Sequence, residues 1–323
     1  MELIYKQLLV NELDSLEVNL VESISSDIKL ASEVSNHLVS SGGKRIRPVV
    51  CILIAKAFNY QGNDLIKLAS SIELLHTATL IHDDVVDQSL IRRGKQSIHA
   101  KWDNAHGVLV GDFVYSKAFQ LMASFENPRI IRTLADATNR ISEGEVLQLA
   151  LKNKEVLTEK EYFEIIDRKT AELFKSAALT AGILSSCSES QLSSLAKFAT
   201  SLGLSFQIQD DILDYFGNEA LTGKRVGKDF EEGKFTLPVL IALKNMDSNE
   251  RDVFLKFFEK GEKESFPEVL QMLSVSNIRE EIDKTFNYYS DICKEEIKGI
   301  PDNEYKTALE PVSYTHLTLP TKA

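Results

Sequence analysis

Apolar residues recur along most of the chain at the three- and four-residue spacing that places them on one face of a helix. The spacing is clearest over residues 65–79 and 195–206. No stretch alternates apolar and polar residues for long enough to predict a strand. The pattern therefore predicts an all-α fold of about ten helices joined by short loops.

Glycine and proline stand where these helices are expected to end, because neither residue supports the interior of a helix. The residues concerned are Gly42, Gly43, Pro48, Gly62, Gly94, Pro128, Gly182, Gly217, Gly223, Gly227 and Pro238. No low-complexity linker, change of composition or repeat of ~30–50 residues divides the chain. We therefore expect a single helical domain.

The last residues of the chain depart from this pattern. Residues 305–310 continue as a helix, and Pro311 is expected to end it, because proline lacks a backbone N–H and crowds the preceding turn. Residues 312–323 lose the helical spacing and resemble translated adapter or vector sequence. We expect one domain over residues 1–311 and a non-native tail over residues 312–323.

Composition is that of a globular protein, with 43% hydrophobic and 26% charged residues. Asp and Glu outnumber Lys and Arg by 48 to 37, and the net charge of −11 disfavours binding to nucleic acid or anionic lipid. The three cysteines lie far apart, and no secretory signal or transmembrane run of ~20 apolar residues is visible. We expect a cytoplasmic protein.

Two acidic segments, residues 83–87 and 210–214, lie within otherwise apolar helices. Residues three, four and seven apart share a helix face, so the aspartates of each segment point together, and Gln207 extends the second polar face. A solvated acidic face is the alternative interpretation. The apolar neighbours favour burial instead, and buried like charges are costly unless a cation neutralises them.

The ligand type indicates which cation this would be. Carboxylate oxygens are hard ligands that suit Mg²⁺, which proteins commonly share between one or two carboxylates and the phosphates of a substrate. Zinc is disfavoured, because no His or Cys cluster accompanies either acidic segment. The two segments therefore predict magnesium-dependent chemistry on a diphosphate.

Basic residues stand near the acidic segments. Arg92 and Arg93 follow the first segment, and residues 42–48 form a glycine-rich loop with three cations that leads into a helix and suits a phosphate. The loop is no P-loop, since the spacing Gly-x-x-x-x-Gly-Lys is absent, so ATP hydrolysis is not indicated. One basic pair alone is usually a surface feature, and the combination is what favours a phosphate site.

Together these motifs resemble the trans-isoprenyl diphosphate synthases over nearly the whole chain, and within them the long-chain polyprenyl synthases of octaprenyl type. The likeness rests on residues 42–48, 80–87, 92–94, 111–113, 169–171, 206–214 and 227–229. It implies an isoprenoid-synthase-type helical bundle around a central cavity, with the two acidic segments facing each other. It also implies a homodimer and about two or three Mg²⁺ ions per site, bound with the substrate diphosphate.

The resemblance assigns roles to individual residues. Magnesium on the allylic diphosphate would be held by Asp83, Asp84, Asp87, Asp210, Asp211 and Asp214. The allylic pocket would be completed by Arg92, Lys169 (also expected to be catalytic), Thr170, Gln207, Lys224 and Lys234. Isopentenyl diphosphate would lie against Lys44, Arg47, His76 and Arg93. A core histidine is the alternative for His76, and its place on the stripe of Asp83 favours substrate binding.

Product length is expected to depend on Ala78 and Thr79, since short-chain members of the family carry bulky aromatics at these positions. A small Ala78 would leave a tunnel open for the growing chain. We therefore expect a long-chain all-trans polyprenyl diphosphate synthase of octaprenyl type, which condenses farnesyl diphosphate with successive isopentenyl diphosphates. Its product would be the side-chain precursor of ubiquinone or menaquinone.

Three alternatives stay open at this point. A shorter-chain farnesyl or geranylgeranyl synthase would share every motif and differ in product length. A non-catalytic subunit of a heteromeric synthase would fail to elongate a primer alone, although such subunits generally lack one of the acidic segments. A helical HD phosphohydrolase is suggested by His82-Asp83, but it would give no role to the second acidic segment.

Overall fold

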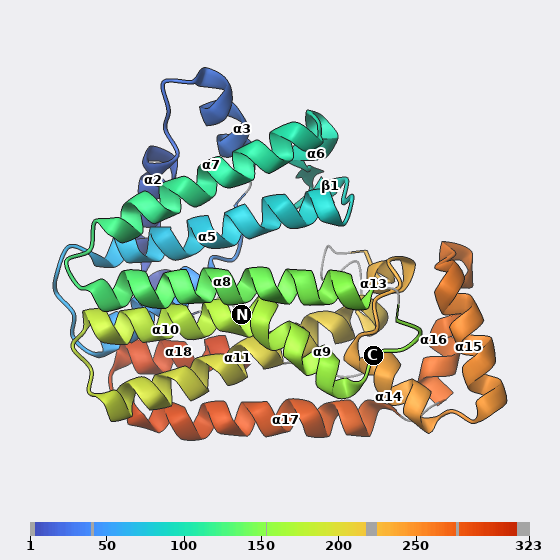
Figure 1. Cartoon of the computed structure of the whole chain (residues 1–323). Helices are drawn as coiled ribbons and strands as arrows, with labels where there is room; N and C mark the ends of the chain where they lie inside the picture. Colours follow the sequence, from blue (N-terminus) through green and yellow to red (C-terminus); the bar gives the residue numbers. More distant parts are fainter. Residues whose placement is uncertain (1–3, 40–41, 153, 218–224, 276–277, 315–323) are drawn as a thin grey trace. The chain divides into compact units, whose positions relative to one another are not determined.

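The computed structural model describes residues 4–39, 42–152, 154–217, 225–275 and 278–314 of the 323-residue chain (Figure 1). Most of these residues are helical, so the predicted all-α fold is confirmed. The α-helices in the described residues are α1 (Ile4–Leu8), α2 (Val10–Ser23), α3 (Lys29–Val39), α4 (Ile46–Ala57), α5 (Leu65–Val86), α6 (Ile98–Lys101), α7 (Asn104–Ala123), α8 (Pro128–Leu151), α9 (Glu159–Ile166), α10 (Glu172–Leu184), α11 (Glu189–Phe216), α13 (Lys228–Glu231), α14 (Leu237–Asn245), α15 (Ser248–Lys260), α16 (Phe266–Val275), α17 (Ile278–Glu296) and α18 (Glu304–Tyr314). They outnumber the predicted helices because several are short.

The chain divides into two compact units. Unit 1 comprises the residues up to Asn139 together with Leu173–Ala196 and Glu296–Val312. Unit 2 comprises Arg140–Glu172 and Lys197–Glu295. The first acidic segment belongs to unit 1 and the second to unit 2. The expected domain boundary at residue 311 stays a prediction.

Unit 1 is built around α5, which packs against α2, α4 and α7. Buried side chains occur all around α5, as expected for a helix that is enclosed by others. Leu68, Ile72 and Leu74 are fully buried, and each such side chain contributes roughly 1.5–3 kcal/mol through the hydrophobic effect. Figure 1 shows α5 and α7 running side by side. The helix that carries the first acidic segment is therefore firmly held.

Two glycines allow α7 to approach the acidic end of α5. A Cβ atom on Gly107 would overlap the side chain of Val85, and a Cβ atom on Gly111 would overlap the ring of His82. Any other residue at these positions would push the two helices apart, because packed interiors leave no room for an added methyl group. Gly111 belongs to the motif over residues 111–113, and this contact gives a physical reason for it.

A small hairpin departs from the strand-free prediction. Strand β1 (Ile91–Arg92) pairs antiparallel with β2 (Lys95–Gln96). The two turn residues between them, Arg93 and Gly94, have φ values of 51° and 76°. Positive φ at both positions is the requirement of a type I′ turn, which favours tight hairpins. The expectation that Gly94 simply ends a helix was therefore incomplete.

Unit 2 has a hydrophobic core of its own, made by α9, the second half of α11, α13, α14, α15, α16 and α17. Aromatic rings contribute much of it. Phe230 contacts Phe258 with ring centroids 5.6 Å apart, and Phe254 stacks on Phe258 at the same distance. Such pairs add about 0.5–1.5 kcal/mol beyond their buried area. This core supports the helix that carries the second acidic segment.

Two predicted helix ends were wrong. Gly182 lies inside α10, where a Cβ atom would stand 2.7 Å from Leu192 Cδ2 and from Leu195 Cδ1, so this glycine permits close packing. Helix α18 continues past Pro311 to Tyr314. A proline removes one backbone hydrogen bond of a helix, and a helix near its own end tolerates that loss. Residues 315–323 of the predicted tail lie outside the described residues.

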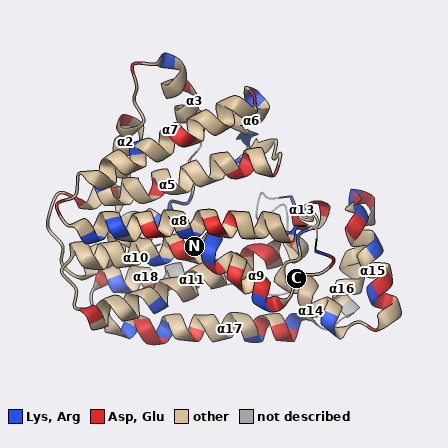
Figure 2. Cartoon of the chain, in the orientation of Figure 1, with Lys and Arg blue, Asp and Glu red and all other residues tan. Residues whose placement is uncertain are grey.

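The surface is mixed in charge, and Figure 2 shows acidic and basic residues interspersed along α15 and α17. On α17, Lys284 pairs with Glu280 and Arg279 with Asp283, each one helical turn apart. Among the described helices, not one combines the length and the apolar character needed to cross a bilayer. Cys51, Cys187 and Cys293 are free thiols.

Candidate active site

The first acidic segment forms the C-terminal end of α5. Asp83 and Asp84 lie in its last turn, and Asp87 caps it by donating its backbone N–H to the carbonyl of Asp83 at 2.8 Å. The C-terminus of a helix carries a partial negative charge, which adds to the charge of the three carboxylates. Cations are therefore strongly favoured at this end of α5.

One of these carboxylates is already paired. Asp84 is 2% exposed and accepts a hydrogen bond from Arg92 Nε at 2.9 Å. Arg92 comes from β1, so the hairpin supplies the cation that lets Asp84 be buried. Asp83 and Asp87 are only partly buried and remain accessible to solvent. The structure thus joins Asp84 to Arg92, which sequence reasoning had assigned to separate tasks.

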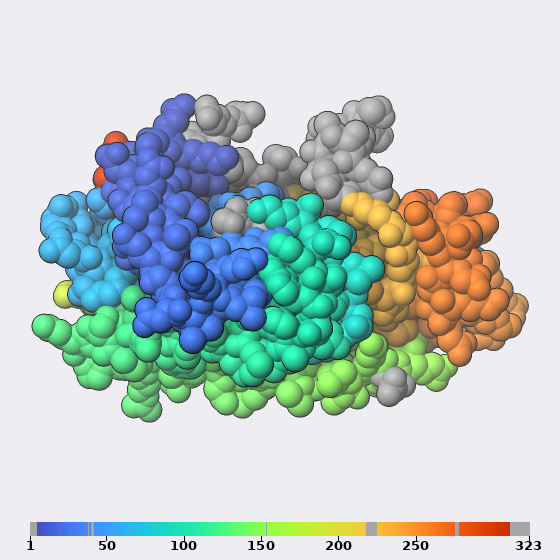
Figure 3. Space-filling view, turned by 90° about the horizontal axis from the view of Figure 1, so that it is seen from above, coloured from blue at the N-terminus to red at the C-terminus, as the bar shows by residue number. Residues whose placement is uncertain are grey.

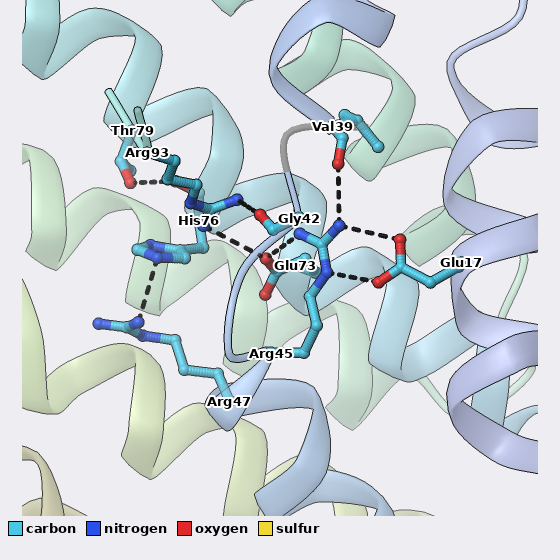
Figure 4. Close-up of polar contacts among 9 residues, drawn as sticks. All are labelled: Glu17, Val39, Gly42, Arg45, Arg47, Glu73, His76, Thr79 and Arg93. Atoms are coloured by element: carbon cyan, nitrogen blue, oxygen red, sulfur yellow. Dashed lines mark hydrogen bonds and ion pairs between the residues drawn. The ribbon is translucent and has the colours of Figure 1, made fainter. Parts of the chain in front are cut away.

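Arg47 and His76 form the centre of a basic cluster in unit 1 (Figure 4). Arg47 Nη1 donates to His76 Nε2 at 3.2 Å, and its guanidinium lies over the ring of Phe174, with Cζ 4.5 Å from the ring centroid. Because arginine has only donors, His76 Nε2 must be the acceptor and its proton must lie on Nδ1. His76 is therefore a neutral imidazole in this arrangement.

Burial and neighbouring charges alter the acidity of both groups. Burial, together with Arg47, Arg93, Arg92 and Arg45, holds the pKa of His76 well below its ordinary value. Burial also lowers the pKa of Arg47 to about 10, with Arg93 contributing in the same direction. Arg47 Nε is buried and has no hydrogen-bond partner within the described part of the chain. A buried N–H without an acceptor beside other cations suits an anionic ligand.

Arg45 departs from the expected three-cation phosphate loop. Its guanidinium donates to Glu17 from Nε at 2.7 Å, to Glu73 from Nη1 at 2.7 Å and to the carbonyl of Val39 from Nη2 at 2.9 Å. Arg45 is buried and holds the loop to α2 and α5. Lys44, its neighbour in sequence, is exposed instead. The loop therefore offers Lys44 and Arg47 to a ligand and uses Arg45 internally.

Arg93 reaches the same loop from the turn of the hairpin. Its Nη1 donates to the carbonyl of Gly42, and its Nη2 lies 3.8 Å from Glu73 Oε1 (Figure 4). Four residues predicted to bind isopentenyl diphosphate thus belong to the elements around one cluster of unit 1: Lys44, Arg47, His76 and Arg93.

The second acidic segment, in unit 2, includes a partly buried chain of hydrogen bonds. Thr170 Oγ1 donates to Gln207 Oε1 at 2.9 Å, and Gln207 Nε2 donates to Asp211 Oδ1 at 2.7 Å. The hydroxyl of Tyr162 donates to Asp211 Oδ2 at 2.6 Å. Both oxygens of Asp211 are thereby engaged, so this aspartate connects three elements of unit 2.

Asp214 holds the start of α13. Its Oδ2 accepts the backbone N–H of Asp229 at 2.9 Å, and its Oδ1 accepts that of Lys228 at 3.2 Å. Lys234 Nζ lies 2.6 Å from Glu232 Oε2. The motif over residues 227–229 is therefore placed directly against the second acidic segment. Lys224, also predicted to bind the substrate, lies outside the described residues.

Negative charge accumulates among these carboxylates. Burial raises the pKa of Asp211 to about 7, and the charges of Asp210 and Asp214 act in the same direction against the hydrogen bonds from Tyr162 and Gln207. Burial and neighbouring carboxylates also raise the pKa of Asp214 and Asp229. A bound divalent cation would relieve this repulsion, and all-oxygen donors suit Mg²⁺.

The donor set thus fits magnesium shared with a substrate, but not a complete protein cage. Over the described residues, no three His, Cys, Asp or Glu side chains are gathered as a metal-binding cluster. Mg²⁺ in phosphate sites usually keeps several waters and takes only one or two carboxylates. Magnesium binding by the six aspartates, and the facing of the two segments across a cavity, stay predictions.

Lys169 and Thr170 lie on a π-helical turn, η1 (Asp167–Ala171), between α9 and α10. Single π turns inside helices are frequent at functional sites, because they redirect a few side chains. Arg140 forms ion pairs at both ends of this turn, with Asp167 and with Glu172, the latter at 2.8 Å. Lys169 Nζ itself lies 2.7 Å from Glu145.

The residues predicted to set chain length lie on α5. Ala78 is completely buried in unit 1, and Thr79 donates its hydroxyl to the carbonyl of His76 at 2.7 Å. Both side chains are small, and both lie on the N-terminal side of the acidic segment. Their role beside a tunnel stays a prediction.

His82, which suggested an HD phosphohydrolase, contacts α7 instead. Its Nε2 lies 3.2 Å from the carbonyl of Val108 and 3.4 Å from Asp112 Oδ1, both on α7. Its ring therefore takes part in the packing of α5 against α7. This arrangement gives no support to a His82-Asp83 metal pair.

Sequence reasoning missed three residues that hold predicted site residues in place: Glu73 in unit 1, and Tyr162 and Arg140 in unit 2. Glu73 lies within an apolar run, and an acidic residue in such a run was the available signal. Tyr162 and Arg140 give no comparable signal, because each acts on a residue far away in sequence.

Comparison with known proteins shows likeness over nearly the whole chain. The family described as polyprenyl synthetase matches residues 28–273. An octaprenyl diphosphate synthase from Haemophilus influenzae is 38% identical over 311 residues, which cover 94% of this chain and 92% of that protein.

Solved structures agree with this likeness. A decaprenyl diphosphate synthase from Rhodobacter capsulatus has a TM-score of 0.90 and 35% identity, with 97% of each chain covered. A polyprenyl synthase from Caulobacter crescentus CB15, complexed with calcium and isoprenyl diphosphate, has a TM-score of 0.90 and 34% identity, covering 96% of this chain and 95% of that one.

Proposed function

Because the chain belongs to the polyprenyl synthetase family, we propose that it is a long-chain all-trans polyprenyl diphosphate synthase of octaprenyl type. The family and the prenyltransferase class predicted from the motifs are thereby confirmed. The proposed substrates are farnesyl diphosphate and successive molecules of isopentenyl diphosphate. The proposed product is the side-chain precursor of a quinone.

The observation that carries the proposal is the order of residues along α5. This one helix bears His76 in a basic cluster, then the small buried Ala78, and then the three aspartates at its C-terminal end. The groups proposed to bind diphosphate therefore lie on the same helix as the residue proposed to limit chain length. The likeness to octaprenyl and decaprenyl synthases supports the long product.

The first step would be ionisation of the allylic diphosphate, which leaves a carbocation and a diphosphate ion. Magnesium, when bound by the six aspartates, would neutralise charge on the departing diphosphate. In unit 1, Arg92 keeps Asp84 buried and oriented. In unit 2, Thr170, Gln207 and Tyr162 orient Asp211. The calcium and isoprenyl diphosphate in the Caulobacter structure support a divalent cation beside such a substrate.

The second substrate would bind at the basic cluster of unit 1. The free N–H of Arg47 Nε, the Arg93 guanidinium and exposed Lys44 would bind its diphosphate, and neutral His76 would donate from Nδ1. Its double bond would attack the carbocation, and a proton would then leave to the departed diphosphate. No side-chain base is required for this sequence of steps.

A homodimer in the cytoplasm is part of the proposal. Helix α7 exposes large apolar side chains at Val108, Leu109 and Phe119. Figure 3 shows the teal segment that contains α6 and α7 at the surface of unit 1. Exposed apolar patches of this kind favour burial against a second protein surface. Light scattering on the purified protein would measure the oligomeric state.

The test is elongation by the purified protein alone. Farnesyl diphosphate, labelled isopentenyl diphosphate and Mg²⁺ should give labelled prenyl products, and removal of the metal with EDTA should abolish them. Elongation that appears only after a second protein is added would instead identify a subunit of a heteromeric enzyme.

A further inference from the structure

Glu73 is a buried acidic residue that the substrate-binding motifs do not include. It lies on α5, one turn before His76, and only 2% of its surface is exposed. A buried carboxylate is costly unless cations and hydrogen bonds satisfy it. In the described part of the chain it forms ion pairs with two arginines: Oε1 accepts from Arg45 Nη1 at 2.7 Å and lies 3.8 Å from Arg93 Nη2 (Figure 4).

Arg45 is fixed from its other side. Glu17 accepts from Arg45 Nε at 2.7 Å and from Nη2 at 3.0 Å, and the carbonyl of Val39 accepts from Nη2 at 2.9 Å. Together with the hydrogen bond to Glu73, this makes four hydrogen bonds from the Arg45 guanidinium. Arg45 is therefore a rigid support for Glu73 and has little left to offer a ligand.

Arg93 depends on this support and on the glycine loop. Its guanidinium donates to the carbonyl of Gly42 and lies against Gly43, where an added Cβ atom would be 2.9 Å from Arg93 Cζ. Gly43 itself has a φ of 151°. The loop and Glu73 together define where the Arg93 guanidinium lies.

We propose that Glu73 is a positioning residue, which holds the Arg93 guanidinium in the place where it binds the diphosphate of isopentenyl diphosphate. Glu73 would not touch the substrate, and it acts through Arg93 and the fixed Arg45. This inference rests on the proposed function, since it assigns the basic cluster to the second substrate.

A pure charge effect makes the opposite prediction. If Glu73 only offset the positive charge of the cluster, its neutralisation would strengthen the attraction for a diphosphate and lower KM. If Glu73 positions Arg93, the same change removes the 3.8 Å ion pair that helps to hold the Arg93 guanidinium, and so weakens binding. The sign of the effect of Glu73→Gln therefore separates the two explanations.

Glu17→Gln is the matched control. It makes the same change of charge on the other side of Arg45, and over the described residues no hydrogen bond or ion pair joins Glu17 to Arg93, which feels the charge of Glu17 only at longer range. We expect Glu73→Gln to raise the KM for isopentenyl diphosphate about tenfold, with kcat and the KM of the allylic primer changed by less than about twofold. Glu17→Gln should change each of these constants by less than about twofold.

Calorimetric titration with inorganic pyrophosphate gives a readout that does not depend on turnover. The affinity of Glu73→Gln should fall by a similar factor, and an unchanged or increased affinity would overturn the inference. If the wild-type protein fails to elongate a primer while this loss of affinity is still found, the proposed function fails and the role of Glu73 in anion binding stands.

Gly43→Ala tests the same idea without a change of charge. The added methyl group would displace the Arg93 guanidinium, so the KM for isopentenyl diphosphate should rise as it does in Glu73→Gln. If Glu73→Gln does not fold, this variant still tests whether the position of the Arg93 guanidinium affects the KM. A folded Gly43→Ala protein with wild-type KM would contradict the inference, because the position of Arg93 would then be unimportant.

Discussion

At the scale of single residues, burial changes the chemistry of the charged groups around α5. Arg47 has a lowered pKa and an unpartnered buried N–H, and His76 beside it is kept neutral. Asp84 is buried only because Arg92 bonds to it. The arrangement of these residues favours a ligand that carries negative charge. Keeping His76 neutral also makes the free energy of unfolding depend on pH.

The contribution of His76 to this pH dependence can be measured. Its pKa in the folded chain lies well below its ordinary value, so the unfolded chain binds an extra proton once the pH falls below about 6.5. The free energy of unfolding should therefore fall from pH 7 to pH 5, by up to about 1.4 kcal/mol per pH unit from this group alone. His76→Gln should lose that part of the slope in denaturant titrations.

Comparing wild type with His76→Gln cancels the contributions of other titrating groups to the pH dependence of stability. Asp211, with a pKa raised to about 7, acts in the opposite direction, because its folded form binds the extra proton between about pH 4 and 7. This contribution is the same in wild type and variant and cancels in the difference. Equal slopes for the two proteins would show that His76 is not held neutral.

Ala78 provides a second test at this scale. We expect Ala78→Phe to shift the products to short prenyl chains while the first condensation continues, because a ring at this buried position would block the proposed tunnel. Overpacking should cost about 1–3 kcal/mol of stability. Chromatography of the products measures their length, with Ala78→Ser as a control of nearly unchanged size. If Ala78→Phe left the product length unchanged, Ala78 would not lie beside the proposed tunnel.

At the scale of elements, short irregular pieces place the side chains that the long helices cannot. The type I′ hairpin directs Arg92 to α5 and Arg93 to the glycine loop. The π turn η1 directs Thr170 to Gln207. In each case a local departure from regular geometry connects a predicted site residue to a neighbouring helix or loop.

Arg140 tests the importance of the π turn, since it bonds to residues at both of its ends. Arg140→Met should lower the free energy of unfolding by only about 1 kcal/mol, because its side chain is 38% exposed. Turnover should fall about tenfold, as Lys169 and Thr170 lose their placement. Arg132→Met, on the same helix, is the control, because Arg132 is 84% exposed and lies 3.9 Å from Asp136. Equal turnover in the two variants would contradict this role of the turn.

At the scale of the whole molecule, net charge and local charge oppose each other. The chain carries −11, whereas the residues around His76 form a compact positive cluster. Salt screens charges beyond about 8–10 Å, so an anionic substrate responds mainly to the cluster. We therefore expect affinity for diphosphate to depend on how a few arginines are held and not on the overall charge.

The sequence predicted the parts of this protein that depend on residues close together in the chain. Helical spacing and the aspartate motifs identified the all-α fold and both acidic segments. Contacts over long separations were not accessible: Tyr162 bonds to Asp211 and Arg45 to Glu73 only because folding brings distant elements together. The hairpin was missed because its turn depends on a non-glycine residue, Arg93, with positive φ.

Product length is the most direct measure of the central claim. The purified protein would be incubated with farnesyl diphosphate, excess isopentenyl diphosphate and Mg²⁺, and its products separated by chromatography against prenyl standards. The proposed long-chain function predicts all-trans products of about octaprenyl length. Products that stop at geranylgeranyl diphosphate, or a failure to elongate farnesyl diphosphate at all, would contradict it.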